Sequence, residues 1–196
     1  MDGEPFAAVL LAGGRSRRMG RDKALLPLPG GGLLWERQLG TLRALGPAEL
    51  FISGPRRDGF PADVPCLDDP RPDCGPLGGI VGALAATRLT KLAILAIDLP
   101  EMTPDFLRAL LARAEPGRGV VPRRGQDGFY EPLAAVYPAS CRALAEQRLA
   151  GGDWSLQSFV RALGGAVSAH DIAPEEERLF LNWNEPAAFS GTAPGA

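Results

Sequence analysis

The strongest constraint on the fold is the alternation of short apolar runs with helical patterns along the chain. Two runs, 6–11 and 92–97, are apolar at every position, which predicts strands covered on both faces. Between them, residues 33–45 carry apolar side chains at helical spacing until Gly46 and Pro47 end the pattern. Strands that alternate with helices predict an α/β fold with a mainly parallel sheet.

Further segments extend this pattern to most of the chain. We expect strands at 49–53, 64–67, 119–122, 133–137 and 166–172, and helices at 80–87, 104–113, 139–149 and 155–163. Thr103 is suited to cap the helix that begins at Pro104. With 196 residues, the chain fits a single domain. We expect this domain to span 1–190 and to be followed by a frayed tail at 191–196.

Composition and charge exclude several classes of protein. Apolar residues make up 45% and charged residues 22% of the chain, as in soluble globular proteins. The net charge of −2 argues against a protein that coats nucleic acid, and no apolar run approaches the ~20 residues that cross a bilayer. The three cysteines lack metal-ligand spacing, and no basic region precedes the first apolar run. We therefore expect a cytoplasmic protein with no nucleic-acid or membrane partner.

The single histidine limits the chemistry that the chain can perform. With only His170 available, a paired-histidine metal site is impossible, and a Ser-His-Asp triad would have to run through this residue. We expect His170 to be a strand-end or surface residue without a catalytic role.

A loop rich in glycine and arginine follows the first strand in "LLAGGRSRRMGRDKALLPLPG", residues 10–30. Glycine lets backbone N–H groups approach an anion, and arginine and lysine add charge-assisted hydrogen bonds. The spacing matches neither G-x-x-x-x-G-K-[ST] nor G-x-G-x-x-G, which disfavours a P-loop kinase and a dinucleotide dehydrogenase. The loop therefore predicts a triphosphate site of another kind. The alternatives are a turn with solvated arginines and an RNA-binding surface, the latter disfavoured by the charge balance and the scarcity of aromatic side chains.

Two aspartates are candidates for ligand contacts. Asp98 directly follows the apolar run 92–97, where a carboxylate needs a partner. Mg²⁺ is commonly held by one or two carboxylates together with substrate phosphates, so Asp98 is a candidate metal ligand. Asp98 could instead cap the following turn, and Asp69 could be a turn residue before Pro70.

The loop at 10–30 resembles the signature L-A-[AG]-G-x-S-x-R-M-G-x-D-K-x-L-L of nucleotidyltransferases that join a nucleotide to a phosphorylated small molecule. Within that superfamily the chain most resembles the molybdenum cofactor guanylyltransferases, which are MobA-like nucleotidyltransferases. The resemblance covers nearly the full length and includes "CLDDPRPDCGPLGGI", "LAIDLPEMTPDFL" and "FLNWNEPAAF". It implies a Rossmann-like three-layer α/β/α sandwich, in agreement with the segment pattern.

The resemblance also implies a role for each matching residue. Backbone groups of four residues would bind GTP: Leu11, Ala12, Gly13 and Gly14. Lys23 and Arg18, or its neighbour Arg17, would neutralise the phosphates during catalysis. Asp69 would contact guanosine, although adjacent Asp68 leaves a one-residue ambiguity, and Asp98 would bind Mg²⁺.

The implied reaction is transfer of GMP from GTP to molybdopterin-bound molybdenum cofactor, with pyrophosphate leaving. Proteins that deliver molybdopterin and chaperones of molybdoenzymes are possible partners. The alternatives are a cytidylyltransferase acting on molybdopterin or on a sugar or polyol phosphate, and a noncatalytic nucleotide-binding module in cofactor delivery.

Some residues depart from the family pattern or keep an open role. Ser53 stands where the family can have asparagine, Ile97 where it can have cysteine, and Trp154 where it tends to have arginine. Four residues of "CGPLGG" are candidates for backbone contact with the base: Gly75, Pro76, Leu77 and Gly79. Asn182 and Asn184 could contact the metal or the pterin, or form a turn before Pro186.

Overall fold

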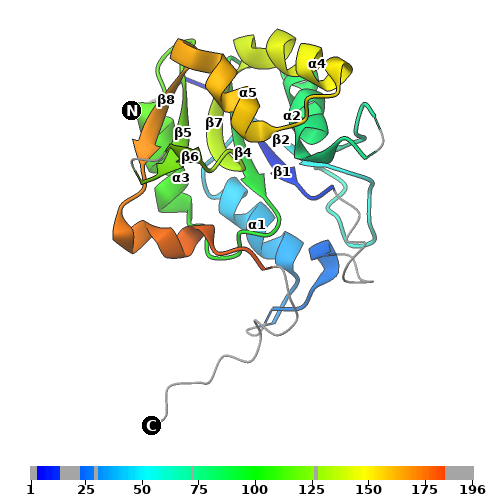
Figure 1. Ribbon diagram of the computed structural model, residues 1–196. Coiled ribbons are helices and arrows are strands. Elements are labelled where there is room, and N and C mark those ends of the chain that lie inside the picture. The colour runs from blue at the N-terminus through cyan, green and yellow to red at the C-terminus, as the bar shows by residue number, and fades with distance from the viewer. Residues whose placement is uncertain (1–3, 14–22, 29–30, 72, 126–127, 184–196) are drawn as a thin grey trace.

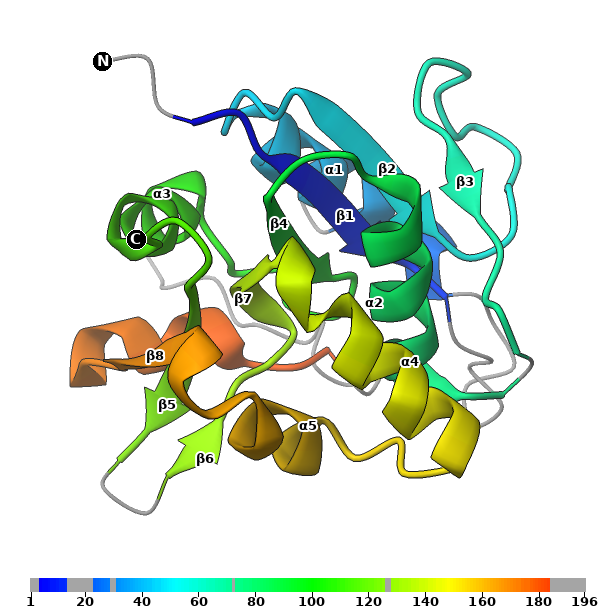
Figure 2. The same ribbon diagram turned by 90° about the horizontal axis from the view of Figure 1, so that it is seen from above.

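The computed structural model describes residues 4–13, 23–28, 31–71, 73–125 and 128–183. The strands are β1 (Ala7–Leu11), β2 (Glu49–Ser53), β3 (Cys66–Leu67), β4 (Lys91–Ala96), β5 (Gly119–Arg124), β6 (Phe129–Tyr130), β7 (Ala134–Pro138) and β8 (Val167–Asp171). They form one eight-stranded sheet in the order β3-β2-β1-β4-β7-β5-β6, with β8 paired to β5 (Figures 1 and 2). The end of the expected domain and the tail at 191–196 lie outside the described residues.

The sheet is mainly parallel, as the alternating pattern predicts. Strands β3, β2, β1 and β4 pair in parallel, and so do β5 and β8. Strand β7 is antiparallel to both of its neighbours, β4 and β5. Parallel strands need a long crossover connection, usually a helix. The connection from β5 to β7 is short and has no helix in its described residues, so β7 runs in the opposite direction to β5.

Helices cover both faces of the sheet. The α-helices are α1 (Leu34–Arg43), α2 (Gly75–Ala86), α3 (Pro104–Arg113), α4 (Arg142–Gly151) and α5 (Leu156–Leu163). Short 3₁₀ segments are η1 (Lys23–Leu25), η2 (Ala139–Cys141), η3 (Gly164–Ala166) and η4 (Pro174–Phe180). Helices α1 and α3 lie on one side of the sheet, and α2, α4 and α5 lie on the other (Figures 1 and 2). The expected three-layer α/β/α sandwich is confirmed.

The burial of β1 explains its uniformly apolar sequence. All five residues of this strand are buried. Ala8 and Leu10 pack in the core on the side of α1 and α3, whereas Ala7, Val9 and Leu11 pack in the core on the side of α2 and α4. Because side chains alternate between the faces of a strand, a strand covered on both faces carries apolar residues throughout.

Helix α2 begins at Gly75, before the start that we expect at Ile80. Gly78 and Gly79 therefore lie inside the helix instead of preceding it. A Cβ atom on Gly79 would lie 2.3 Å from Oγ of Ser53, so glycine lets α2 pack closely on β2. The two glycines, which come just before the helix expected at 80–87, instead lie inside α2 and serve close packing.

Two expectations concern residues that contact Phe106. The side chain of Thr103 accepts a hydrogen bond from the backbone N–H of Phe106 at 3.3 Å, which confirms it as the N-cap of α3. His170 does lie at the end of β8, but it is only 8% exposed and packs edge-on against Phe106. The strand-end position expected for His170 is therefore confirmed, with the side chain buried and not on the surface. Within the described residues, no helix has the length and apolarity needed to span a bilayer.

Candidate active site

The carboxyl ends of β1 and β4 meet at the point where the strand order reverses. Strand β1 pairs with β2 on one side and with β4 on the other, so that Leu11 lies beside both Ser53 and Ala96. In open α/β sheets, ligands bind in the crevice at such a switch point. Gly13 and Asp98 both follow directly from these strand ends, as the sequence predicts.

The backbone after β1 is in close contact with the backbone after β2. Gly54 has φ of +117°, and a Cβ atom on it would lie 2.9 Å from Cα of Gly13. The N–H of Ala12 donates to the carbonyl of Ser53 at 3.1 Å, and the carbonyl of Leu11 accepts from Ile97 at 3.1 Å. Two backbone groups that the sequence assigns to nucleotide binding thus already have partners inside the protein.

Gly13 ends the first described part of this loop, and Asp69 lies opposite it. A Cβ atom on Gly13 would lie 3.6 Å from Oδ2 of Asp69. The other carboxylate oxygen, Oδ1, accepts a hydrogen bond from Oγ of Ser53 at 3.4 Å. Asp68 is exposed, so the structure brings Asp69 and not Asp68 toward β1. Gly14, Arg17 and Arg18 lie outside the described residues.

The environment of Asp69 favours protonation of its carboxyl more than water does. Burial raises the pKa of Asp69 above its ordinary value, and the neighbouring charge of Asp68 adds to this effect, whereas the hydroxyl of Ser53 opposes it. Ser53 itself is only 2% exposed. At the position where the family can have asparagine, this chain thus has a buried hydroxyl that orients Asp69.

Lys23 and Asp98 form an ion pair at the end of β4. Nζ of Lys23 lies 3.5 Å from Oδ2 of Asp98, and the two side chains are 22% and 25% exposed. The pair brings together one of the predicted phosphate-binding cations and the predicted metal ligand. Both groups remain accessible enough to contact a triphosphate.

Three segments hold the turn that carries Asp98. The backbone N–H of Trp183 donates to the carbonyl of Asp98 at 3.0 Å, which places Asn182 and Trp183 next to this turn. Nε2 of Gln38, from α1, donates to the carbonyls of Ala96 at 3.1 Å and Leu99 at 2.8 Å. The third segment is β1, through Leu11. The sequence interpretation missed Gln38, although a polar residue one turn from Leu34 and Leu42 on an otherwise apolar helix face is a readable signal.

The remaining residues predicted to contact substrate or metal differ in whether they are exposed. Leu77 and Gly79 are buried within α2, so that they are not accessible to a base, whereas Gly75 and Pro76 are exposed in its first turn. Asn182 is exposed beside Trp183, and Asn184 lies outside the described residues.

Trp154 replaces the arginine that the family pattern favours, and it contacts the end of α4. Its Nε1 donates to the carbonyl of Leu149 at 3.3 Å. The same carbonyl accepts from Nη1 of Arg71 at 3.2 Å, and Arg71 belongs to the loop that carries Asp69. This loop is therefore attached to α4.

The donor groups fit magnesium better than a transition metal. Within the described ranges, no three His, Cys, Asp or Glu side chains cluster as a metal site. The available group is one partly exposed carboxylate, Asp98, next to a lysine. Mg²⁺ prefers hard oxygen ligands and is commonly held by one or two carboxylates plus substrate phosphates.

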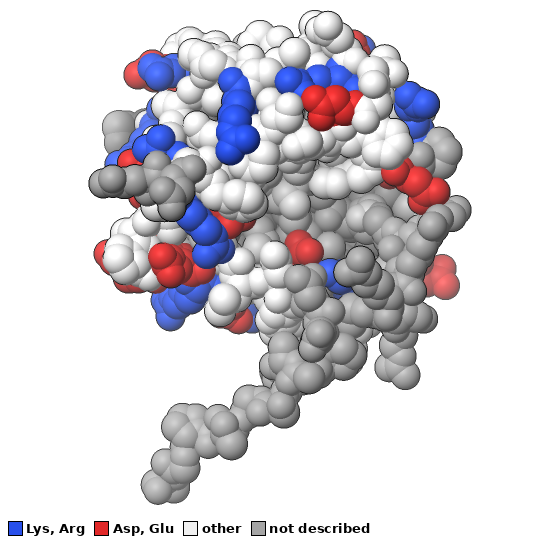
Figure 3. Space-filling view, in the orientation of Figure 1, with Lys and Arg blue, Asp and Glu red and all other residues white. Residues whose placement is uncertain are grey.

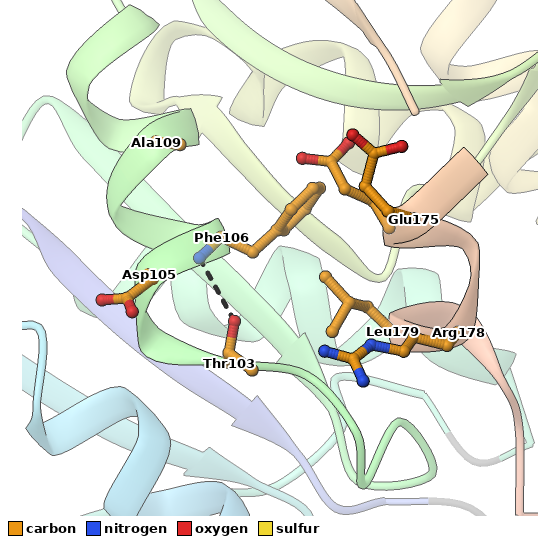
Figure 4. Close-up of a pocket in the computed structure, with 8 residues that line it drawn as sticks. Thr103, Asp105, Phe106, Ala109, Glu175, Arg178 and Leu179 are labelled. Atoms are coloured by element: carbon orange, nitrogen blue, oxygen red, sulfur yellow. Dashed lines mark hydrogen bonds between the residues drawn. The ribbon is translucent and has the colours of Figure 1, made fainter. Parts of the chain in front are cut away.

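A separate cavity of about 310 Å³ lies between α3 and η4 (Figure 4). Its lining includes Phe106, Asp105, Glu175 and Arg178, but none of the predicted site residues. On the face shown in Figure 3, the described Lys and Arg side chains are interspersed with Asp and Glu. This mixture of charges is that of an ordinary solvated surface.

Comparison with known proteins shows the family to which the chain belongs. Residues 8–167 match the family model of the MobA-like NTP transferase domain. A probable molybdenum cofactor guanylyltransferase of Opitutus terrae is 42% identical over 189 residues, which cover 92% of this chain and 91% of the relative. The molybdenum cofactor guanylyltransferase of Xanthomonas euvesicatoria is 33% identical over 193 residues, covering 95% and 93% of the two chains.

Solved structures share the fold at lower sequence identity. The molybdopterin-guanine dinucleotide biosynthesis protein A of Archaeoglobus fulgidus superposes with a TM-score of 0.69 at 23% identity, covering 93% of each chain. A nucleotidyl transferase from Methanothermobacter superposes with a TM-score of 0.74 at 20% identity, covering 94% of each chain. Both structures support the α/β Rossmann-like architecture.

Proposed function

Because the chain belongs to the MobA-like NTP transferase family, we propose that it transfers GMP from GTP to molybdopterin-bound molybdenum cofactor. The products are the guanine dinucleotide cofactor and pyrophosphate. One observation carries the proposal: Lys23 and Asp98 pair at the switch point of the sheet, next to the loop of Gly13. Relatives named as guanylyltransferases over nearly the full length favour GTP over other nucleotides.

The reaction needs alignment and charge compensation more than acid–base chemistry. An oxygen of the terminal phosphate of molybdopterin attacks the α-phosphorus of GTP, and the bond to the bridging oxygen of pyrophosphate breaks. The attacking phosphate is already ionised near neutral pH, so no general base is required. This agrees with the position of the single histidine, because His170 is buried beside Phe106.

Lys23 and Asp98 have complementary roles in this proposal. The ammonium group of Lys23 offsets the repulsion between the two anionic substrates, and Asp98 would hold Mg²⁺. Mg²⁺, when bound, stabilises the charge that develops on the phosphates. Arg18 and the backbone of Gly14 are proposed triphosphate contacts on the strength of the resemblance alone.

Asp69 is the proposed guanine contact. A carboxylate can accept hydrogen bonds from both N1–H and the N2 amino group of guanine, a pair of donors that cytosine lacks. Oδ1 of Asp69 is oriented by Ser53, and Oδ2 faces the loop after β1. Partial burial strengthens a charge-assisted hydrogen bond to the base, because less water competes for the carboxylate.

The acceptor side of the site and its cellular context are also proposals. The bond from Trp183 to Asp98 supports a role for the adjacent asparagines in contacting pterin or metal. The three cysteines are free thiols, which supports a reducing compartment such as the cytoplasm. There, delivery and chaperone proteins would supply molybdopterin and receive the product.

The decisive experiment supplies the purified protein with molybdopterin, Mg²⁺ and GTP, CTP or ATP in separate reactions. Pyrophosphate release and mass analysis of the pterin product are measured together. We expect the guanine dinucleotide from GTP alone. A product from CTP alone would identify a cytidylyltransferase, and nucleotide binding without any product would identify a noncatalytic module.

A further inference from the structure

Gln38 is a buried amide whose hydrogen bonds flank Asp98 on both sides. The residue is 0% exposed, in the middle of α1. Its Nε2 donates to the carbonyls of Ala96 and Leu99, before and after Asp98 in the chain, at 3.1 and 2.8 Å. One side chain thus spans the turn that carries the proposed metal ligand.

Stability alone does not account for an amide at this position. Oε1 of Gln38 is buried and has no hydrogen-bond partner in the described part of the chain. The cost of a buried acceptor without a partner offsets the gain from the hydrogen bonds that Nε2 donates. The net contribution to folding is small, so the geometric effect on the turn is the larger consequence.

The amide restricts the direction in which Asp98 points. Both carbonyls adjacent to the turn are held from α1, while Trp183 holds the carbonyl of Asp98 itself. The partly exposed carboxylate then projects from a turn whose backbone is held on three sides. Groups that orient a metal ligand in this way affect metal affinity without touching the metal.

We propose that Gln38 is a positioning residue that aims the Asp98 carboxylate at the metal–triphosphate complex. The inference rests on the proposed function, because it concerns the same site. It predicts a specific defect: weaker metal binding with the nucleotide pocket intact. The amide acts through the backbone of the turn and does not contact substrate.

The test compares Gln38→Leu with the wild-type protein in two binding measurements. Mn²⁺ serves as a paramagnetic probe, and its binding to the protein–GTP complex is followed by electron paramagnetic resonance. GTP binding without metal is measured by calorimetry in EDTA. We expect Gln38→Leu to weaken Mn²⁺ binding about 10-fold or more, with metal-free GTP affinity unchanged. Asp98→Asn serves as the reference for loss of the metal ligand.

Two further variants separate positioning from a general defect in the core. Gln38→Met keeps the length of the side chain but removes the donor group, so it should weaken Mn²⁺ binding as Gln38→Leu does. Leu42→Val alters the same buried helix face one turn later and should leave Mn²⁺ binding unchanged. Wild-type Mn²⁺ affinity in Gln38→Leu, an equal loss in Leu42→Val, or failure of both Gln38 variants to fold would overturn the inference.

These outcomes are distinguishable from failure of the proposed function. If the wild-type protein forms no guanine dinucleotide, the proposed reaction is wrong, whereas the Mn²⁺ measurements still report whether Gln38 positions Asp98. If the wild-type protein is active and Gln38→Leu binds metal normally, only the positioning role is wrong.

Discussion

Nζ of Lys23 lies 3.5 Å from Oδ2 of Asp98, and this contact joins the segment after β1 to the end of β4. Since both groups are partly exposed, the pair contributes little to stability, about 0–1 kcal/mol. Its proposed importance lies in catalysis. We therefore expect Asp98→Asn to lower kcat by about 10²- to 10³-fold with a nearly unchanged free energy of unfolding. Pyrophosphate release and urea denaturation measure the two quantities.

Asp63 provides the matched control for this substitution. Its side chain is 74% exposed and pairs with Arg43 on the surface. Asp63→Asn removes the same charge and should leave kcat unchanged. Wild-type turnover by Asp98→Asn at saturating GTP and Mg²⁺ would contradict a role for the carboxylate in the reaction.

Asp69 should make the stability of the protein depend on pH. Its pKa is raised in the folded state, mainly by burial, above an ordinary value of 3.8. As pH rises from 3.8 through the raised value, the unfolded state releases its proton first, so stability falls in this window. Asp69→Asn lacks this loss. The unfolding free energy of Asp69→Asn minus that of the wild-type protein should therefore increase with pH across this window and then become constant.

Urea denaturation at closely spaced pH values, without nucleotide, measures this difference. Ser53→Ala removes the hydroxyl that lowers the pKa of Asp69. In this variant the loss of stability should therefore continue to a higher pH than in the wild-type protein. A difference between Asp69→Asn and wild type that stays constant with pH would show that burial does not perturb this carboxyl.

Gly79 and Gly82 lie on the same helix but should respond oppositely to alanine. A Cβ atom on Gly79 would lie 2.3 Å from Oγ of Ser53, whereas one on Gly82 would come no closer than 3.7 Å to the carbonyl of Asp68. Gly79→Ala should destabilise the fold by about 1–3 kcal/mol through overpacking. Gly82→Ala should stabilise it by about 0.5–1 kcal/mol through helix propensity.

Unfolding free energies of the two variants, measured in parallel, check this contrast. Gly79→Ala also displaces Ser53 and with it Asp69, so it should raise the KM for GTP, while Gly82→Ala should not. Equal stability of the two variants would show that α2 can move away from β2 without cost.

The sequence predicts the central strands and α3 correctly because the residues of these elements themselves carry the signal. Strand β4 is apolar at every position after Lys91, and α3 begins at Pro104 after a Thr103 cap. The reversed direction of β7 and the two-residue strand β6 have no such signal, because pairing across the sheet determines them. The start of α2 was misplaced because glycines that permit helix packing are also typical of loops.

The candidate site divides in the same way. The strand-end positions of Gly13 and Asp98 follow from the parallel sheet, so sequence is sufficient to predict them. The ion pair of Lys23 with Asp98 and the hydrogen bond of Ser53 to Asp69 depend on how separate segments pack. Gln38 falls between these two cases. The sequence shows a polar side chain on an apolar helix face, but it does not predict which backbone carbonyls this side chain contacts.

Arg71 should affect nucleotide affinity more than turnover. Its Nη1 donates to the carbonyl of Leu149 at 3.2 Å and thereby attaches the loop of Asp69 to the end of α4. Loss of a hydrogen bond worth about 0.5–1.5 kcal/mol converts to about a 2- to 10-fold change in affinity. Arg71→Met should therefore raise the KM for GTP about 2- to 10-fold with kcat unchanged, the pattern of lost uniform binding. The control is Arg142→Met, which breaks an exposed pair with Glu146 on the same helix. An equal fall in kcat and kcat/KM for Arg71→Met would instead place its effect in the transition state.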